Sequence, residues 1–106
     1  MKAMICQPMS GKTEAVIREE RAEAINYLEA KGYEVVDTVF PDFKNEGNIP
    51  LKYLAKSLEV MADVDLVYFM KGWENARGCR IEHKCCDAYE ISYECECDCG
   101  CLNRSF

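Results

Sequence analysis

One short segment of the sequence contains residues that suit covalent chemistry. This segment, "GWENARGCRIEH" from Gly72 to His83, directly follows a very apolar run and surrounds Glu82 with a tryptophan, glycines and arginines. A carboxylate held rigidly at the mouth of a pocket can attack an anomeric carbon, as in retaining glycosidases. Trp73 can stack on a flat base or on the apolar face of a sugar. These residue types can therefore support glycosidic-bond chemistry, with Glu82 as one candidate nucleophile.

Glu82 also has a simpler interpretation. A glutamate early in a helix complements the helix dipole, and for any single such residue this structural role is the more common one. The neighbouring residues nevertheless favour ligand binding. Arg77 and Arg80 can meet an anionic ligand, and Gly78 lets a ligand approach the backbone.

The eight cysteines raise metal binding as a separate possibility. Cys79, His83 and Cys86 lie at positions i, i+4 and i+7 of a predicted helix, so three potential zinc ligands share one face. Most such triads are packing residues, because reduced cysteine behaves as a small apolar side chain. The segment "CECDCGC", residues 95–101, can bind a soft metal such as Cu(I), cross-link subunits or simply end the chain. We expect no resident cofactor, and the helical triad remains the alternative metal site.

The periodicity of apolar residues predicts the elements that must position these groups. Helical spacing predicts helices at residues 13–31, 50–62 and 77–89. Apolar and β-branched runs predict strands at residues 3–6, 33–40, 65–70 and 91–95. The alternation of strands and helices predicts an α/β fold whose parallel sheet is covered by helices on both faces.

A sheet of this kind binds ligands beyond the carboxyl ends of its strands. Residues 7–12, 38–50 and 71–82 should therefore converge at one edge of the sheet. Residues 41–50 are bracketed by prolines and rich in turn formers, so they predict a surface loop that can cover the site. Ser10 and the N–H groups of the first predicted helix can receive a 5′-phosphate, although "SGK" lacks the glycine spacing of an NTPase phosphate loop.

Length and composition limit the class of protein. A chain of 106 residues is expected to form one domain, and 49% apolar with 30% charged residues is ordinary for a globular protein. The net charge of −6 argues against a general binder of nucleic acids or anionic membranes. No signal peptide or membrane span is predicted, so we expect a cytoplasmic protein in which disulfides do not hold the fold together.

Three stretches together resemble a known group of proteins. "QPMSGK" after the first strand, "DLVYFM" as the third strand and "GWENARGCRIEHKCCDAYEI" before the last strand are similar to the nucleoside 2-deoxyribosyltransferase-like superfamily. The similarity is greatest to a small, uncharacterised phage and bacterial branch, and it covers roughly residues 1–93. We therefore divide the chain into a domain at residues 1–94 and a cysteine-rich tail at residues 95–106.

The resemblance implies a fold, an activity and a set of site residues. It implies a flavodoxin-like (Rossmann-like) three-layer sandwich with four or five parallel strands, in homodimers or larger homo-oligomers. Its enzymes cleave or exchange the N-glycosidic bond of nucleosides or nucleoside monophosphates through a glutamate that aligns with Glu82. The ligand-binding residues predicted on this basis and from the segment above are Gln7, Pro8, Met9, Ser10, Gly11, Trp73, Arg77 and Gly78.

Two departures from the superfamily pattern keep other functions open. Ala76 stands where the transferases carry an aspartate and the small branch often a serine, and a second acidic position falls near Ser57. His83 points about 100° round the helix from Glu82, so it is a weak substitute for the missing acid. Three hypotheses follow: an N-glycosidase or deoxyribosyltransferase, a non-catalytic nucleotide-binding protein on the same fold, and a metal-binding oligomer built through the tail.

Overall fold

The computed structural model describes residues 1–9, 11–36 and 47–96 of the chain. Its strands are β1 (Lys2–Cys6), β2 (Glu34–Val35), β3 (Leu66–Phe69) and β4 (Tyr93–Cys95), and its helices are α1 (Glu14–Ala30), α2 (Ile49–Met61) and α3 (Arg77–Ala88), with a short 3-10 turn at Trp73–Asn75. The described strands form one parallel sheet in the order β2-β1-β3-β4. The predicted α/β fold with a flavodoxin-like parallel sheet is confirmed.

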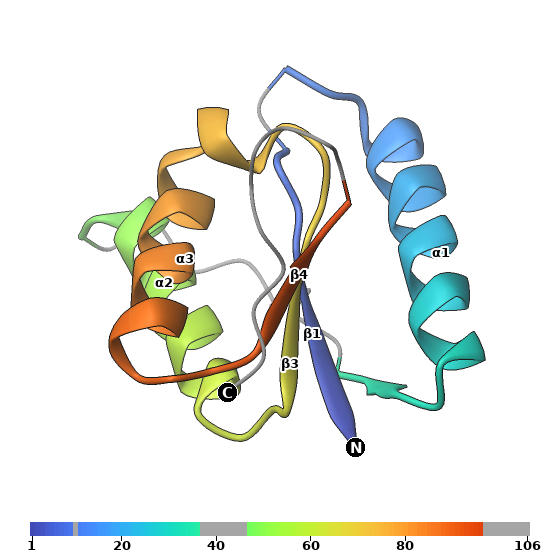
Figure 1. The fold of residues 1–106 in the computed structure, drawn as a ribbon. Helices are drawn as coiled ribbons and strands as arrows, with labels where there is room; N and C mark the ends of the chain where they lie inside the picture. Colours follow the sequence, from blue (N-terminus) through green and yellow to red (C-terminus); the bar gives the residue numbers. More distant parts are fainter. Residues whose placement is uncertain (10, 37–46, 97–106) are drawn as a thin grey trace.

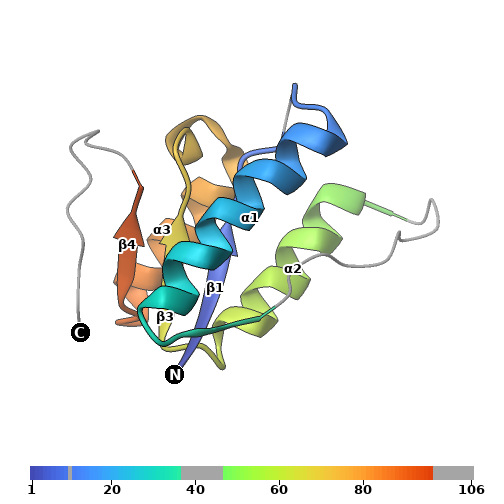
Figure 2. The ribbon, with the colours of Figure 1, turned by 90° about the vertical axis from the view of Figure 1, so that its right-hand side faces the viewer.

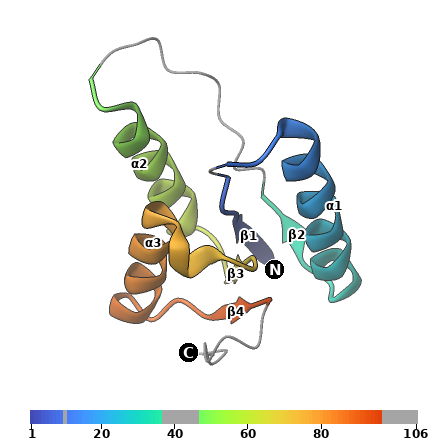
Figure 3. The same ribbon diagram turned by 90° about the horizontal axis from the view of Figure 1, so that it is seen from above.

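The chain forms three layers, with this sheet in the middle and helices on both of its faces (Figure 1). Seen from above, α1 lies on one side of the sheet and α2 and α3 lie together on the other (Figure 3). A second side view shows α1 lying across its face of the sheet (Figure 2). No helix within the described ranges is long and apolar enough to cross a membrane.

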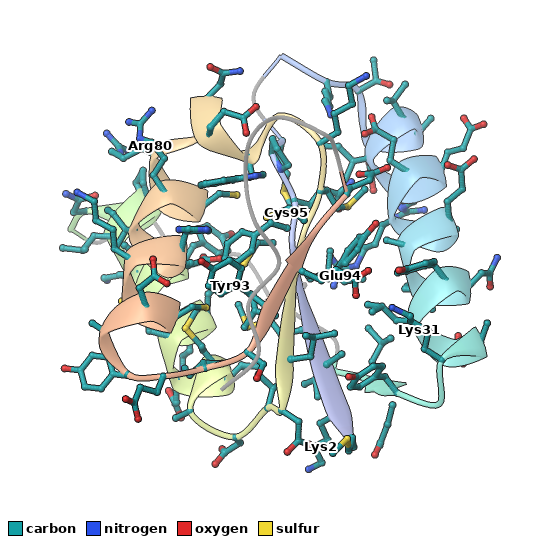
Figure 4. The ribbon with its side chains drawn as sticks, in the orientation of Figure 1. Lys2, Lys31, Arg80, Tyr93, Glu94 and Cys95 are labelled. Atoms are coloured by element: carbon teal, nitrogen blue, oxygen red, sulfur yellow. The ribbon has the colours of Figure 1, made fainter. Side chains whose placement is uncertain are left out.

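Two apolar clusters hold the layers together because strand side chains alternate between the faces. The cluster beneath α1 contains Ala3, Ile5, Ala24, Leu28, Leu66, Tyr68 and Met70. The cluster beneath α2 and α3 contains Met4, Cys6, Met61, Val67, Phe69, Cys79, Cys86 and Tyr93. The last strand follows the same alternation: Tyr93 faces α3, whereas Glu94 faces α1 and accepts hydrogen bonds from Tyr27 and Lys31 (Figure 4). The clusters fix the helices that carry the candidate site.

Local signals explain where two of the helices begin. The Thr13 hydroxyl accepts a hydrogen bond from the N–H of Val16 at the start of α1, and the Asn48 side chain does the same for Leu51 in α2. Ala76 occupies the corresponding position before α3 and has no side-chain oxygen to offer. The helix that carries Glu82 therefore begins without a side-chain cap.

The strand predictions differ from the structure mainly in length. The strand predicted at 33–40 appears as β2, only two residues long, and residues 37–46 lie outside the described part of the chain. The strand predicted at 91–95 begins at Tyr93. Cys6, Cys79, Cys85 and Cys86 are free thiols, as expected, whereas Cys95 is disulfide-bonded.

Candidate functional site

The loops after β1 and β3 meet at the carboxyl edge of the sheet, as the parallel fold predicts. Cys6 and Phe69 are register partners at the ends of the two strands, and the N–H of Met70 donates to the carbonyl of Cys6 over 3.0 Å. Gly72 follows with a φ of +91°, and a Cβ placed on it would lie 3.7 Å from Cγ of Pro8. The two predicted ligand-binding segments are therefore in close proximity.

Glu82 reaches this edge from α3 and is buried. Only 7% of the residue is exposed, and the Cys6 thiol at the end of β1 donates a hydrogen bond to its Oε2 atom. Burial raises the pKa of Glu82 from 4.5 to about 6, while the hydrogen bond from Cys6 acts in the opposite direction. Glu82 is therefore a desolvated carboxylate that still ionises near neutral pH.

Three thiols interact with Glu82: Cys6 by a hydrogen bond, and Cys79 and Cys86 electrostatically. Burial and the negative charge of Glu82 raise the pKa of Cys79 and Cys86 to about 12 and that of Cys6 well above its usual 9.0. A cysteine attacks electrophiles as its thiolate, so these three side chains are poor nucleophiles. They act as weakly polar neighbours, and Cys6 acts as a hydrogen-bond donor.

Trp73 lies against His83 with one face of its indole. The two rings are nearly parallel, 11° apart in plane and 4.3 Å between centroids. Phe69 packs beside both rings, at 5.4 Å from Trp73 and 5.1 Å from His83. The predicted stacking of Trp73 on a ligand can therefore use only the opposite face of the ring.

His83 belongs to an aromatic cluster. Its ring also contacts Tyr93, at 4.5 Å between centroids, and its Nδ1 lies 3.8 Å from Oδ2 of Asp87. Burial lowers the pKa of His83 below 6.5, and the charge of Asp87 opposes that shift. His83 is therefore neutral at pH 7 and packs against Trp73. Glu82, on the same helix, contacts Cys6 instead.

The remaining predicted ligand residues lie around the edge with different exposure. Gln7 is buried, and its Nε2 donates to the carbonyl of Ile17 in α1 over 2.7 Å, while its Oε1 has no hydrogen-bond partner. The amide of Gln7 thus points to the α1 side, away from the layer that holds Glu82. Pro8 is half-buried, Met9, Gly11 and Arg77 are exposed, and Gly78 is half-buried with open space where a side chain would begin; Ser10 lies outside the described residues.

The zinc alternative is not supported by the arrangement of the described residues. They include no group of three or more His, Cys, Asp and Glu side chains that could hold a metal ion. Cys79 and Cys86 pack in the core beneath α3, and His83 turns to the aromatic cluster. Residues 97–101 of the predicted tail site lie outside the described part of the chain.

Sequence reasoning missed Cys6, although the sequence contained a signal for it. Cys6 is the last residue of the first apolar run, so alternation along the strand places it on the same face as Met4. Its partner Glu82 lies 76 residues away in the sequence. A polar side chain at the carboxyl end of a central strand is a candidate site residue in this fold.

A comparison with known families matches almost all of the chain. The family described as "Domain of unknown function (DUF4406)" matches residues 1–93. The chain belongs to the DUF4406 family. No curated protein and no solved structure matches this DUF4406 protein significantly. The matched span includes β1, α3 and the edge where Cys6 meets Glu82, so the candidate site lies within the DUF4406 domain.

The hydrogen bond from Cys6 predicts a shift in the titration of Glu82. Cys6→Ala removes the donor, so the pKa of Glu82 should rise above about 6. Cys6→Ser keeps a donor of similar size and should leave the pKa close to the wild-type value. Carboxyl carbon NMR of glutamate-labelled protein measures both. A pKa in Cys6→Ala that equals or falls below the wild-type value would contradict the assigned contact.

The raised pKa of Glu82 also predicts a pH-dependent stability difference. The folded-state pKa of about 6 exceeds the usual 4.5, so the protonated form stabilises the fold below pH 4.5 and this contribution is lost as the pH rises through 6. Glu82→Gln cannot ionise, so its free energy of unfolding should exceed that of the wild type by about 2 kcal/mol at pH 7.5. At pH 4 the two proteins should have similar stability. Urea unfolding at the two pH values tests this, and an equal difference at both would refute it.

Proposed function

We propose that this DUF4406 protein is a nucleoside or nucleotide N-glycosidase or deoxyribosyltransferase in which Glu82 attacks the anomeric carbon. One observation carries the proposal: a buried carboxylate lies at the carboxyl edge of the sheet, with Oε2 held by Cys6 and a pKa of about 6. At pH 7 roughly nine-tenths of such a group is ionised. The resemblance of the sequence to the deoxyribosyltransferase-like superfamily, in which the nucleophilic glutamate aligns with Glu82, supports the proposal.

The proposed reaction proceeds in two displacement steps. A carboxylate oxygen of Glu82 forms a bond to the anomeric carbon, and the bond to the base breaks with its electron pair leaving on the base nitrogen. The departing base takes up a proton. Water or a second base then attacks the same carbon and releases Glu82, which gives hydrolysis or transfer respectively. The hydrogen bond from Cys6 to Oε2 orients the free carboxylate for the first step.

Proton delivery to the base is the weak part of this site. Ala76 has no polar atom in its side chain, Ser57 lies half-buried on α2, and His83 stacks on Trp73. General acid catalysis normally contributes a factor of about 10² to 10⁴. The proposed enzyme is therefore slow, or it takes its acid from the substrate or from a second copy of the chain in a homo-oligomer.

The first functional test is base release from a panel of nucleosides and nucleoside monophosphates. Chromatography should detect free base, and Glu82→Gln should reduce its rate by about 10³-fold or more. Glu19→Gln, an exposed change on α1, is the matched control and should retain the wild-type rate. The rate should fall as the pH drops through about 6, because protonation removes the nucleophile. Base release that is equal in Glu82→Gln and the wild type would exclude this role.

Ala76 provides a gain-of-function test of the missing acid. Ala76→Asp and Ala76→Asn both supply an N-cap oxygen to α3, so each should raise the free energy of unfolding by about 1 kcal/mol. Only the aspartate can carry a proton, so only Ala76→Asp should also speed base release, by about 10-fold or more. Thermal unfolding and the base-release assay separate the two effects. Equal rates in both variants would show that this position does not deliver the proton.

The apolar side chain of Ala76 favours a second function, which is nucleotide binding without turnover. An apolar Ala76 in place of an acid leaves a scaffold that can hold a nucleotide with no means to protonate its base. Calorimetry that detects nucleotide binding, together with no base release from any compound of the panel, would support a sequestering protein.

A further inference from the structure

The turn after β3 places Trp73 at the carboxyl edge of the sheet. The N–H of Trp73 donates to the carbonyl of Met70 over 3.1 Å, and Gly72 has a φ of 91° and a ψ of 3°. Lys71 is not among the described residues with a positive φ. These angles identify residues 70–73 as a type II turn, in which Gly72 takes the position that requires a positive φ.

A type II turn does not use the N–H of its second residue. Its internal bond joins the carbonyl of Met70 to the N–H of Trp73, so the N–H of Lys71 is available to a partner outside the turn. Glu96 supplies that partner, because its Oε2 accepts the N–H of Lys71 over 2.7 Å. The turn that carries Trp73 is therefore bonded to the residue that directly follows β4.

The backbone of Glu96 belongs to the ladder between β3 and β4. In this ladder the N–H of Val67 donates to the carbonyl of Ser92, and the N–H of Glu96 donates to the carbonyl of Phe69 over 2.9 Å. Further steps of two residues on each strand would join the N–H of Lys71 to the backbone carbonyl of Glu96. The carboxylate of Glu96 takes the place of that carbonyl. A charged acceptor makes the stronger bond of the two.

Residues 69–73 are thus held from both neighbouring strands. On the β1 side, the N–H of Met70 donates to the carbonyl of Cys6 over 3.0 Å. On the β4 side, the backbone N–H and the side chain of Glu96 make one bond each. The family match ends at residue 93, so the bonds on the β4 side come from a residue beyond the matched span.

The backbone of Trp73 decides where the free face of its indole points. The other face lies on His83, at 4.3 Å between centroids, and Phe69 packs beside the ring. His83 is fixed by α3 and Phe69 by β3, whereas the backbone of Trp73 is placed by the turn. A change in the turn would therefore move the indole across His83 and redirect the face that can meet a ligand.

We propose that Glu96 is a positioning residue of the candidate site. Its carboxylate fixes the turn at residues 70–73 and, through the turn, the orientation of Trp73. Glu96 takes no part in the reaction itself. The effect on Trp73 is a property of the fold alone, whereas its consequence for ligand affinity rests on the proposed nucleotide binding.

Fluorescence tests the positioning directly, because Trp73 is the only tryptophan of the chain. Glu96→Ala removes the acceptor, so the emission should shift to longer wavelength and acrylamide quenching should increase as the indole opens to water. Glu96→Gln keeps an acceptor of the same length and should retain most of the wild-type signal.

Glu94→Ala is the matched control for this test. It removes a glutamate from the same part of the chain, but Glu94 accepts hydrogen bonds from Tyr27 and Lys31 on the α1 side rather than from the turn (Figure 4). Its Trp73 signal should equal that of the wild type. A signal that is unchanged in Glu96→Ala, or that changes equally in Glu94→Ala, overturns the proposal.

Calorimetry with a nucleoside monophosphate measures the consequence for the site. Glu96→Ala should raise Kd by about 5-fold, because the binding-competent turn is then populated for only part of the time, while kcat for base release should change by less than about 2-fold. A fall in kcat with an unchanged Kd contradicts a role through Trp73. A wild-type protein that binds no nucleotide refutes the proposed function, and the fluorescence of Trp73 then decides the role of Glu96 alone.

Discussion

The hydrogen bond between Cys6 and Glu82 is the contact on which the candidate site depends. It joins the end of β1 to α3, and it satisfies one oxygen of a carboxylate that is 7% exposed. Burying a charged carboxylate is costly unless it is hydrogen-bonded, and here burial raises the pKa to about 6. Residues that were kept only for stability would avoid this cost by using an apolar side chain. The buried, hydrogen-bonded position of Glu82 therefore supports the chemistry proposed at the sheet edge.

Glu82 is a reactive carboxylate with few proton donors around it. Thiols with raised pKa values stay neutral, so Cys6, Cys79 and Cys86 add no negative charge beside the carboxylate. Trp73 and His83 form a stacked pair that packs on Phe69 and, through His83, on Tyr93 of β4. Ala76 leaves the start of α3 without a polar side chain. This combination fits a nucleophile better than a complete acid and base pair, and it explains why slow turnover and binding alone are the two functions to compare.

Much of the fold could be predicted from the sequence, but contacts between distant residues could not. Periodic apolar residues located the three helices of the described residues to within a few positions, and the apolar run at Leu66–Phe69 identified a central strand. The position of Glu82 at the carboxyl edge followed from the parallel sheet. Its contact with Cys6 spans 76 residues, and the stack of His83 on Trp73 depends on rotamers set by Phe69 and Tyr93. Alternation along the first strand marks Cys6 as a candidate, but neither pairing leaves a pattern in local sequence, and the same is true of the burial that raises the pKa of Glu82.

In the proposed reaction Glu82 forms a covalent bond to a sugar. Intact-protein and peptide mass spectrometry after rapid acid quenching of a reaction with a nucleoside or nucleotide substrate measures this bond directly. A mass increase of one sugar unit is expected on the peptide that contains Glu82, and it should be absent from Glu82→Gln treated in the same way. Base release with no adduct at any quench time, or an adduct on another residue, would contradict the assignment of Glu82 as the nucleophile.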